Sequence, residues 1–128
     1  MGKPKLKWSQ KGEDSDFDAA RNYLSLIASP AKAEGLVRAL RAAEPIDRAA
    51  KDLLRAAGAP LLPREEPHVA DDIKRIDKGK PLTPVLLVRG DMAKGLPLTI
   101  ADGYHRICAV VYYDESAPVR CRLASEGN

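Results

Sequence analysis

Prolines and glycines cut this chain into short segments, and they limit what it can fold into. The sequence has 10 prolines and 9 glycines in 128 residues. Proline ends a helix that precedes it but is tolerated in the first turn of the next helix, and glycine is typical of the residue after a helix. Each helix or strand is therefore expected to be short. The longest charge-free run of the strand-rich half, 81–88, is far below the roughly 20 residues of a membrane-spanning helix, so we expect no membrane partner.

The first half of the chain is predicted to be helical. Residues 1–13 are polar without an apolar period, which indicates a flexible arm. The segment 15–18 resembles a capping box and opens a helix over 16–28. Ala-rich apolar stripes predict two more helices over 30–43 and 46–57. Helices this short are marginal alone, so we expect the three to pack on the rest of the molecule.

The second half mixes helices and strands. Apolar residues at helical spacing predict helices, and short branched apolar runs predict strands. In chain order, the expected elements are a helix from 69 to Gly79, a strand over 84–88, a loop over 90–97, a strand over 98–101, a turn at 102–103, a helix over 107–113 and a strand over 118–123. We therefore predict a single α+β domain: a small mixed sheet with packed helices over 60–124, preceded by a three-helix extension over 14–58.

Charge and cysteine usage narrow the class of protein. The 21 basic and 18 acidic side chains are interspersed and leave a net charge of +3, which is too weak to predict DNA binding. No apolar run of a signal peptide follows the first lysines, so we expect a cytoplasmic protein. Cys108 and Cys121 form no CxxC pair, and two histidines without an HExxH spacing predict no metal site. Reduced, buried thiols are expected.

The segment most informative about chemistry joins a strand to a helix through Asp102-Gly103-Tyr104-His105-Arg106. Glycine lets the backbone turn sharply, and the N–H groups at a helix start have no intrahelical acceptor. An imidazole and a guanidinium in that first turn oppose the helix dipole unless an anion is bound. We therefore predict a phosphate there, gripped by Arg106 and contacted by His105. The alternative is structural: Arg106 pairs with Asp102, and His105 fills a partly buried polar slot.

These residues resemble the ParB/sulfiredoxin superfamily. Gly103, Arg106 and Ala109 match the Gly-x-x-Arg-x-x-Ala helix start at which its members bind nucleotide phosphates, and sulfiredoxins have a similar Gly-Gly-Cys-His-Arg turn. The likeness in element order covers residues 62–123. It also places His68, before a valine, where sulfiredoxins have a phosphate-binding lysine before a valine. The resemblance thus implies that His68 joins the turn residues on the phosphates of a nucleotide.

The chain departs from each familiar branch of that superfamily. Tyr104 stands where sulfiredoxins have the reactive cysteine, so repair of peroxiredoxins is not expected. ParB proteins continue into a helix-turn-helix DNA reader, whereas this sequence ends soon after the last predicted strand, which argues against plasmid partition. Free serine kinases have a similar Asp-Gly-His turn, but His follows Gly directly, where this chain has Tyr104.

Three carboxyl groups near the turn are further candidates. Asp102 is suited to hold Mg²⁺, orient a ribose or act as a general base, and its structural alternative is an Asx-type turn bond. Glu65 and Glu66 lie on a proline-bounded loop expected to approach the same helix start. A carboxylate there is either catalytic or simply solvated.

Four other side chains have two interpretations each. Lys78 and Lys80 either extend a phosphate site or are ordinary helix-end lysines. Tyr104 either stacks on a base or covers the turn. Trp8 either docks on the first helix or marks a partner surface.

The sequence therefore predicts a nucleotide- or phosphate-binding protein, with ATP or another nucleoside triphosphate and Mg²⁺ as the expected ligand. Phosphoryl transfer is the expected reaction of an enzyme built on such a site, because that chemistry needs positioning and charge neutralisation more than a covalent nucleophile. Whether the chain catalyses a reaction stays open. One alternative is a non-catalytic interaction module, gated by nucleotide, whose helical first half binds a protein partner. A ParB-like nuclease is less favoured, because it needs a clearer acidic metal cluster than Asp102 alone.

Overall fold

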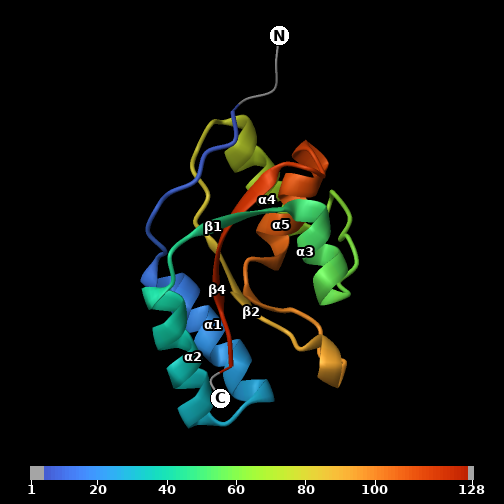
Figure 1. The fold of residues 1–128 in the computed structure, drawn as a ribbon. Coiled ribbons are helices and arrows are strands. Elements are labelled where there is room, and N and C mark those ends of the chain that lie inside the picture. The colour runs from blue at the N-terminus through green and yellow to red at the C-terminus, as the bar shows by residue number, and fades with distance from the viewer. Residues whose placement is uncertain (1–4, 127–128) are drawn as a thin grey trace.

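Four strands form one mixed sheet in the order β1-β4-β2-β3 (Figure 1). The computed structural model describes residues 5–126. The strands are β1 (Ile46–Ala49), β2 (Val85–Val88), β3 (Thr99–Asp102) and β4 (Pro118–Ala124). β2 and β4 run parallel at the centre, and β1 and β3 pair antiparallel at the two edges. The predicted α+β class with a mixed sheet is confirmed.

Helices cover both faces of the sheet. Residues 5–126 contain α1 (Asp14–Ile27), α2 (Pro30–Ala42), α3 (Ala50–Ala57), α4 (Pro67–Asp77), α5 (Tyr104–Tyr113) and a short 3₁₀ turn, η1 (Met92–Lys94). Helices α1 and α2 form one layer, and α3, α4 and α5 form the other (Figure 1). All four β2 residues are buried, as expected for a strand covered on both sides.

The two layers bury separate apolar cores, one on each face. Alternate residues of β2 point to opposite faces, so Leu86 and Val88 belong to one core while Val85 and Leu87 belong to the other. The α1–α2 layer contributes Phe17, Ala20, Leu24, Ala33, Leu36, Val37 and Leu40 to its core. The first two predicted helices therefore pack on the sheet through their apolar stripes. The prediction is wrong at Ile27, which was expected on the stripe of the first helix but is 58% exposed at the end of α1.

The third predicted helix, over 46–57, is wrong in its first turn. Residues 46–49 form strand β1 at the edge of the sheet, and α3 begins only at Ala50. Antiparallel pairing with β4 places Ile46 opposite Cys121. Without β1, β4 would present an unpaired edge, so the pairing overrides the helix propensity of this Ala-rich segment.

Two other predicted starts differ from the structure. Glu13 occupies the N-cap of α1 and makes no side-chain cap bond, so the capping box predicted over 15–18 is wrong. Helix α5 begins at Tyr104, three residues before the predicted 107–113. The earlier start puts His105 and Arg106 inside the first turn, as the anion argument requires.

Part of the predicted flexible arm is docked. Residues 1–4 lie outside the described residues. The Ser9 N–H donates to the Leu82 carbonyl over 2.9 Å, and the Leu82 N–H donates to the Lys7 carbonyl over 3.0 Å. Trp8 packs against the core that contains α5, rather than against the first helix. The arm prediction is therefore wrong for residues 7–9.

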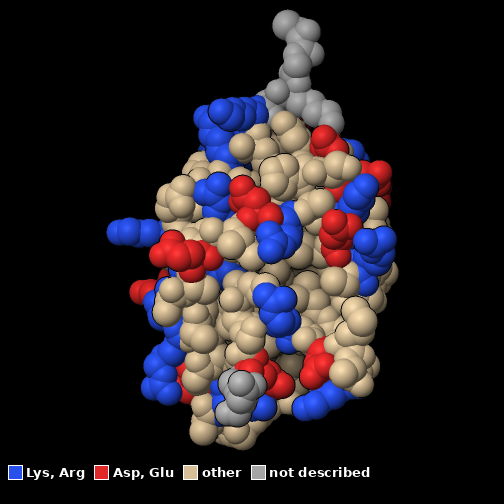
Figure 2. All heavy atoms as spheres, viewed as in Figure 1, with Lys and Arg blue, Asp and Glu red and all other residues tan. Residues whose placement is uncertain are grey.

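The surface carries charges of both signs. Figure 2 shows lysines and arginines mixed with aspartates and glutamates over the visible face, in line with the interspersed charges of the sequence. Within residues 5–126, no helix has both the length and the apolar character needed to cross a bilayer.

Candidate functional site

The start of α5 is an uncapped helix end that only glycine permits. Gly103 occupies the N-cap position with φ 105°, in the left-handed region, and makes no side-chain cap bond. A Cβ atom there would lie 2.5 Å from Val85 Cγ1. A larger residue would therefore push the helix start off β2. The first N–H groups of α5 have no intrahelical acceptor. Gly103, His105 and Arg106, at this helix start, form part of the lining of a polar hollow.

Arg106 is held by protein groups on several sides. Its Nη1 donates to the Thr83 carbonyl over 2.7 Å and also to the Thr83 hydroxyl, and its Nη2 lies 2.5 Å from Asp102 Oδ2. Asp16 Oδ2 lies 3.4 Å from Nη1. Only 11% of the side chain is exposed. The structure therefore contains the ion pair with Asp102 that the sequence offered as the alternative, and a role of Arg106 toward phosphate stays a prediction.

Asp102 lies beside a second carboxyl group, that of Asp16 in α1. Burial, with a smaller contribution from Asp16, raises the pKa of Asp102 to about 6, although Arg106 opposes the shift. Asp16 Oδ2 also accepts a 2.6 Å hydrogen bond from the Thr83 hydroxyl. A carboxyl group with a pKa near 6 suits proton transfer near neutral pH, although here it is also paired with Arg106.

Glu66, His68 and His105 form a cluster at the starts of α4 and α5. Glu66 caps α4 by accepting the N–H groups of His68 and Val69 over 3.0 and 3.2 Å. These bonds, led by that from His68, hold the pKa of Glu66 down to about 2, although burial opposes the shift. His68 Nδ1 lies 3.0 Å from Glu66 Oε1, and His105 Nε2 lies 3.5 Å from Glu66 Oε2. The two imidazole rings are 4.7 Å apart, centre to centre.

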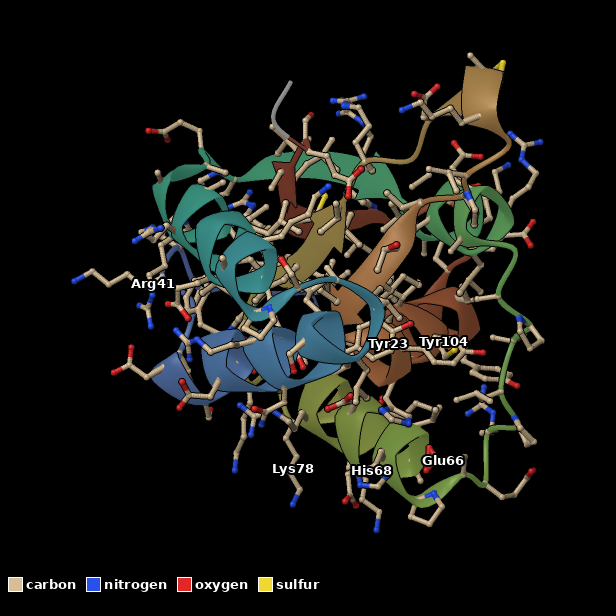
Figure 3. All side chains as sticks on the ribbon, turned by 90° about the horizontal axis from the view of Figure 1, so that it is seen from below. Tyr23, Arg41, Glu66, His68, Lys78 and Tyr104 are labelled. Atoms are coloured by element: carbon tan, nitrogen blue, oxygen red, sulfur yellow. The ribbon has the colours of Figure 1, made fainter. Side chains whose placement is uncertain are left out.

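The cluster bears on two predictions from the sequence, the placement of His68 and the position of the loop before α4. His68 and His105 are brought together, and the loop before α4 approaches the start of α5 as predicted. Of the two glutamates, Glu66 is the one in the cluster, and Glu65 is exposed. Figure 3 shows Glu66 and His68 at the same end of α4.

Two hollows lie beside the start of α5. The polar hollow has a volume of about 250 Å³ and is lined by His68, Asp71, Asp72, Asp102, Gly103, His105 and Arg106. The larger hollow has a volume of about 500 Å³ and is lined mostly by apolar residues of α3, β3 and the segment before β3, with Tyr23 and Tyr104 among them. Asp102, Gly103 and His105 line both hollows. One hollow therefore suits a polar group and the neighbouring one an apolar group.

Tyr104 is tied to the loop that follows α3. Its hydroxyl donates to the Pro60 carbonyl, and its ring lies 6.0 Å from that of His105, centre to centre. Tyr23 reaches the same hollow from α1, and Figure 3 shows the two tyrosines on the side of the molecule where Glu66 and His68 lie. Tyr104 thus forms a wall of the larger hollow, and stacking on a base stays a prediction.

Lys78 and Lys80 lie away from the site. Lys78 is the C-cap of α4, and an 11-residue helix is about 16 Å long. Since the cluster lies at the other end of α4, these lysines do not extend the polar hollow. Their interpretation as helix-end lysines is the one that the structure supports.

Cys108 and Cys121 are free, buried thiols, as predicted. Burial raises the pKa of both thiols, that of Cys121 to about 11. Such thiols are poor nucleophiles at neutral pH.

Sequence reasoning missed three contributors to the site. Asp16 was assigned to a helix cap, and nothing in the sequence links it to Arg106, 90 residues later. Thr83 belongs to no motif of the sequence, and only the fold brings it to Arg106. Asp72 lines the polar hollow, and burial raises the pKa of its carboxyl group while Arg106 and His105 oppose the shift. The available sequence signal for Asp72 was its spacing of four residues from His68, because residues three or four apart share one face of a helix.

Comparisons with known proteins add no relative to this description. No family model, no curated protein and no solved structure matches the chain.

Proposed function

We propose that this chain binds a nucleotide, with its phosphates at the start of α5 and its nucleoside in the larger hollow. The observation that carries the proposal is that a polar and a mostly apolar hollow share Asp102, Gly103 and His105 in their linings. Free helix N–H groups and imidazoles donate hydrogen bonds to phosphate oxygens. The larger hollow, at about 500 Å³, has the size of a small-ligand site and offers the tyrosine rings Tyr23 and Tyr104 to a base.

The charges of the polar hollow favour a nucleotide that arrives with a divalent cation. Three carboxyl groups, from Asp71, Asp72 and Asp102, line the hollow, and its one guanidinium is already paired with Asp102. Without a cation, the negative phosphates would be repelled by these carboxylates. Mg²⁺ coordinates both carboxylate and phosphate oxygens, so we propose a nucleoside triphosphate with Mg²⁺ as the ligand.

Phosphoryl transfer is the reaction that such a site would support. Asp102 is the candidate for either Mg²⁺ coordination or removal of a proton from an acceptor hydroxyl. The proposal agrees with the resemblance to the ParB/sulfiredoxin superfamily, which itself remains a proposal. Free thiols are typical of proteins in a reducing compartment, and both cysteines of this chain are free. We therefore also propose that the protein is cytoplasmic.

A second candidate is a non-catalytic module whose surface changes with nucleotide. One observation favours it: Leu26 and Ile27, at the end of α1, are 81% and 58% exposed, and Tyr23 of the same helix lines the larger hollow. Exposed apolar clusters mark surfaces for partners. Product analysis separates the two candidates, because only an enzyme converts the bound nucleotide.

Calorimetric titration of the full chain with each nucleoside triphosphate, with and without Mg²⁺, tests the proposal. Ala57 lines the larger hollow, so Ala57→Trp is expected to weaken binding by roughly tenfold or more, about 1.4 kcal/mol. Ala42→Trp, at the exposed end of α2, is the matched control and should bind normally. Absence of binding for all nucleotides, or equal affinity of the two variants when both are folded, would contradict the proposal.

A further inference from the structure

We infer that Glu66, His68 and His105 bind one divalent transition-metal ion, with Zn²⁺ as the expected occupant. The site shares His68 and His105 with the polar hollow of the proposed nucleotide site, but the inference needs no nucleotide, so each proposal can fail without the other. Their sequence spacing matches no familiar metal motif. Only the packing of α4 against α5 brings the three together.

The ligand atoms are nearly in place. One carboxylate oxygen and one ring nitrogen from each histidine lie within 4.8 Å of one another. Bonds of about 2.0–2.1 Å in a tetrahedral zinc site put ligand atoms roughly 3.3 Å apart. His68 Nδ1 lies 3.0 Å from Glu66 Oε1 and His105 Nε2 lies 3.5 Å from Glu66 Oε2, so each histidine is near that separation from one of the two carboxylate oxygens. His68, 73% exposed, has room to rotate and close the remaining distance to His105.

The donor set fits a transition metal rather than Mg²⁺. Two imidazoles and one carboxylate are ligands that zinc binds well, whereas Mg²⁺ prefers oxygen ligands. Glu66 is also fixed in position, because each of its oxygens accepts one backbone N–H at the start of α4. Each carboxylate oxygen keeps a second lone pair for the ion. Outer contacts of this kind orient metal ligands.

Three protein ligands leave one tetrahedral position open. His68 and His105 line the polar hollow, so this position faces the hollow. A water molecule or an anion would occupy it, as in zinc sites that keep an exchangeable ligand. The geometry therefore points to an ion that is reachable from solvent.

Titration with Co²⁺ tests the inference, because tetrahedral Co²⁺ absorbs visible light and substitutes for Zn²⁺. The full chain is used without a histidine tag and without nucleotide. We expect a 1:1 spectral change that Zn²⁺ reverses. His105→Ala and Glu66→Gln should each weaken Co²⁺ affinity by roughly 10- to 100-fold or more, since even outer-shell changes cost that much. Glu65→Gln, beside the cluster, is the matched control and should bind like the unchanged chain.

Two results would overturn the inference. One is no spectral change with the unchanged chain. The other is unaltered affinity in His105→Ala, which would place the ion on the aspartates of the hollow instead. Because Glu66 also caps α4, circular dichroism melts check that each variant is folded, and His105→Ala, which removes no cap, keeps the test valid if Glu66→Gln unfolds. A failure of nucleotide binding leaves these outcomes unchanged, because no nucleotide is present.

Discussion

At the scale of single residues, Arg106 joins three parts of the fold. Its guanidinium contacts Asp16 in α1, Thr83 before β2 and Asp102 at the end of β3. A buried charge is tolerated only with such partners, because removing it from water costs several kcal/mol in free energy. Arg106→Ala would therefore weaken the fold as well as any ligand contact, and it is a poor probe of binding by itself.

Gly103 gives a cleaner prediction at this scale. Gly103→Ala should lower the free energy of unfolding by about 2–5 kcal/mol, because the left-handed conformation costs about 1–2 kcal/mol and the contact with Val85 adds about 1–3 kcal/mol. Urea denaturation measures this change.

Gly58→Ala is the matched control for this experiment. Gly58 also has a positive φ, 64°, but a Cβ atom there would meet no atom within 4 Å. It should therefore lose only the conformational part, about 1–2 kcal/mol. Equal losses in the two variants would show that the approach of Gly103 to Val85 is not a constraint.

At the scale of elements, α1 does more than cover the sheet. Asp16 brings a carboxyl group from α1 to Asp102 and Arg106. In the sequence, α1 precedes β2, whereas Asp102 and Arg106 follow it. This helix belongs to the half that sequence analysis offered as a partner surface, and it thus also affects the electrostatics of the site.

The expected consequence is a change in the titration of Asp102. Asp16→Asn should lower the pKa of Asp102 from about 6 toward its ordinary value of 3.8, but only partly, because burial is the larger cause. Carbon-13 NMR of the Asp102 carboxyl group follows the titration. Asp14→Asn is the control, since Asp14 in the same helix contacts Arg41 on the surface. An unchanged pKa in Asp16→Asn would contradict the role given to α1.

The raised pKa of Asp102 also makes the stability of the fold depend on pH. Since the folded state holds the Asp102 proton to higher pH than the unfolded chain, this group's contribution to stability falls as pH rises between the ordinary pKa of 3.8 and about 6. The fall should be smaller in Asp16→Asn.

Sequence analysis predicted the elements whose signals are local. The apolar stripes of α1 and α2, the buried run of β2 and the glycine before α5 are such signals. It missed β1 because Ala-rich segments favour helix, and only the distant edge of β4 makes residues 46–49 a strand. For the same reason it does not reveal the contact between His68 and His105, which are 37 residues apart and meet only through helix packing.

At the scale of the whole molecule, the α1–α2 layer is required by the sheet. It covers Leu86, Val88, Ala101 and Ala124 on one face. A sheet with one bare apolar face is unstable in water, and neither helix is stable alone.

We therefore expect a fragment of residues 46–128, which lacks this layer, not to fold. Thermal melting followed by circular dichroism should show no cooperative transition for the fragment, whereas the full chain should show one. A fragment that melts cooperatively at the same temperature as the full chain would show that the sheet and the α3–α5 layer suffice.

The central place of β4 also governs how the chain is made. A ribosome produces the residues of β1, β2 and β3 before those of β4, yet β4 lies between β1 and β2. Arg122 of β4 also donates hydrogen bonds to the carbonyls at the end of α2, including that of Ala43 over 2.7 Å. Until residues 118–124 are released, the nascent chain exposes two unpaired strand edges. Such edges invite pairing with other chains, so this topology delays closure of the sheet until β4 has left the ribosome.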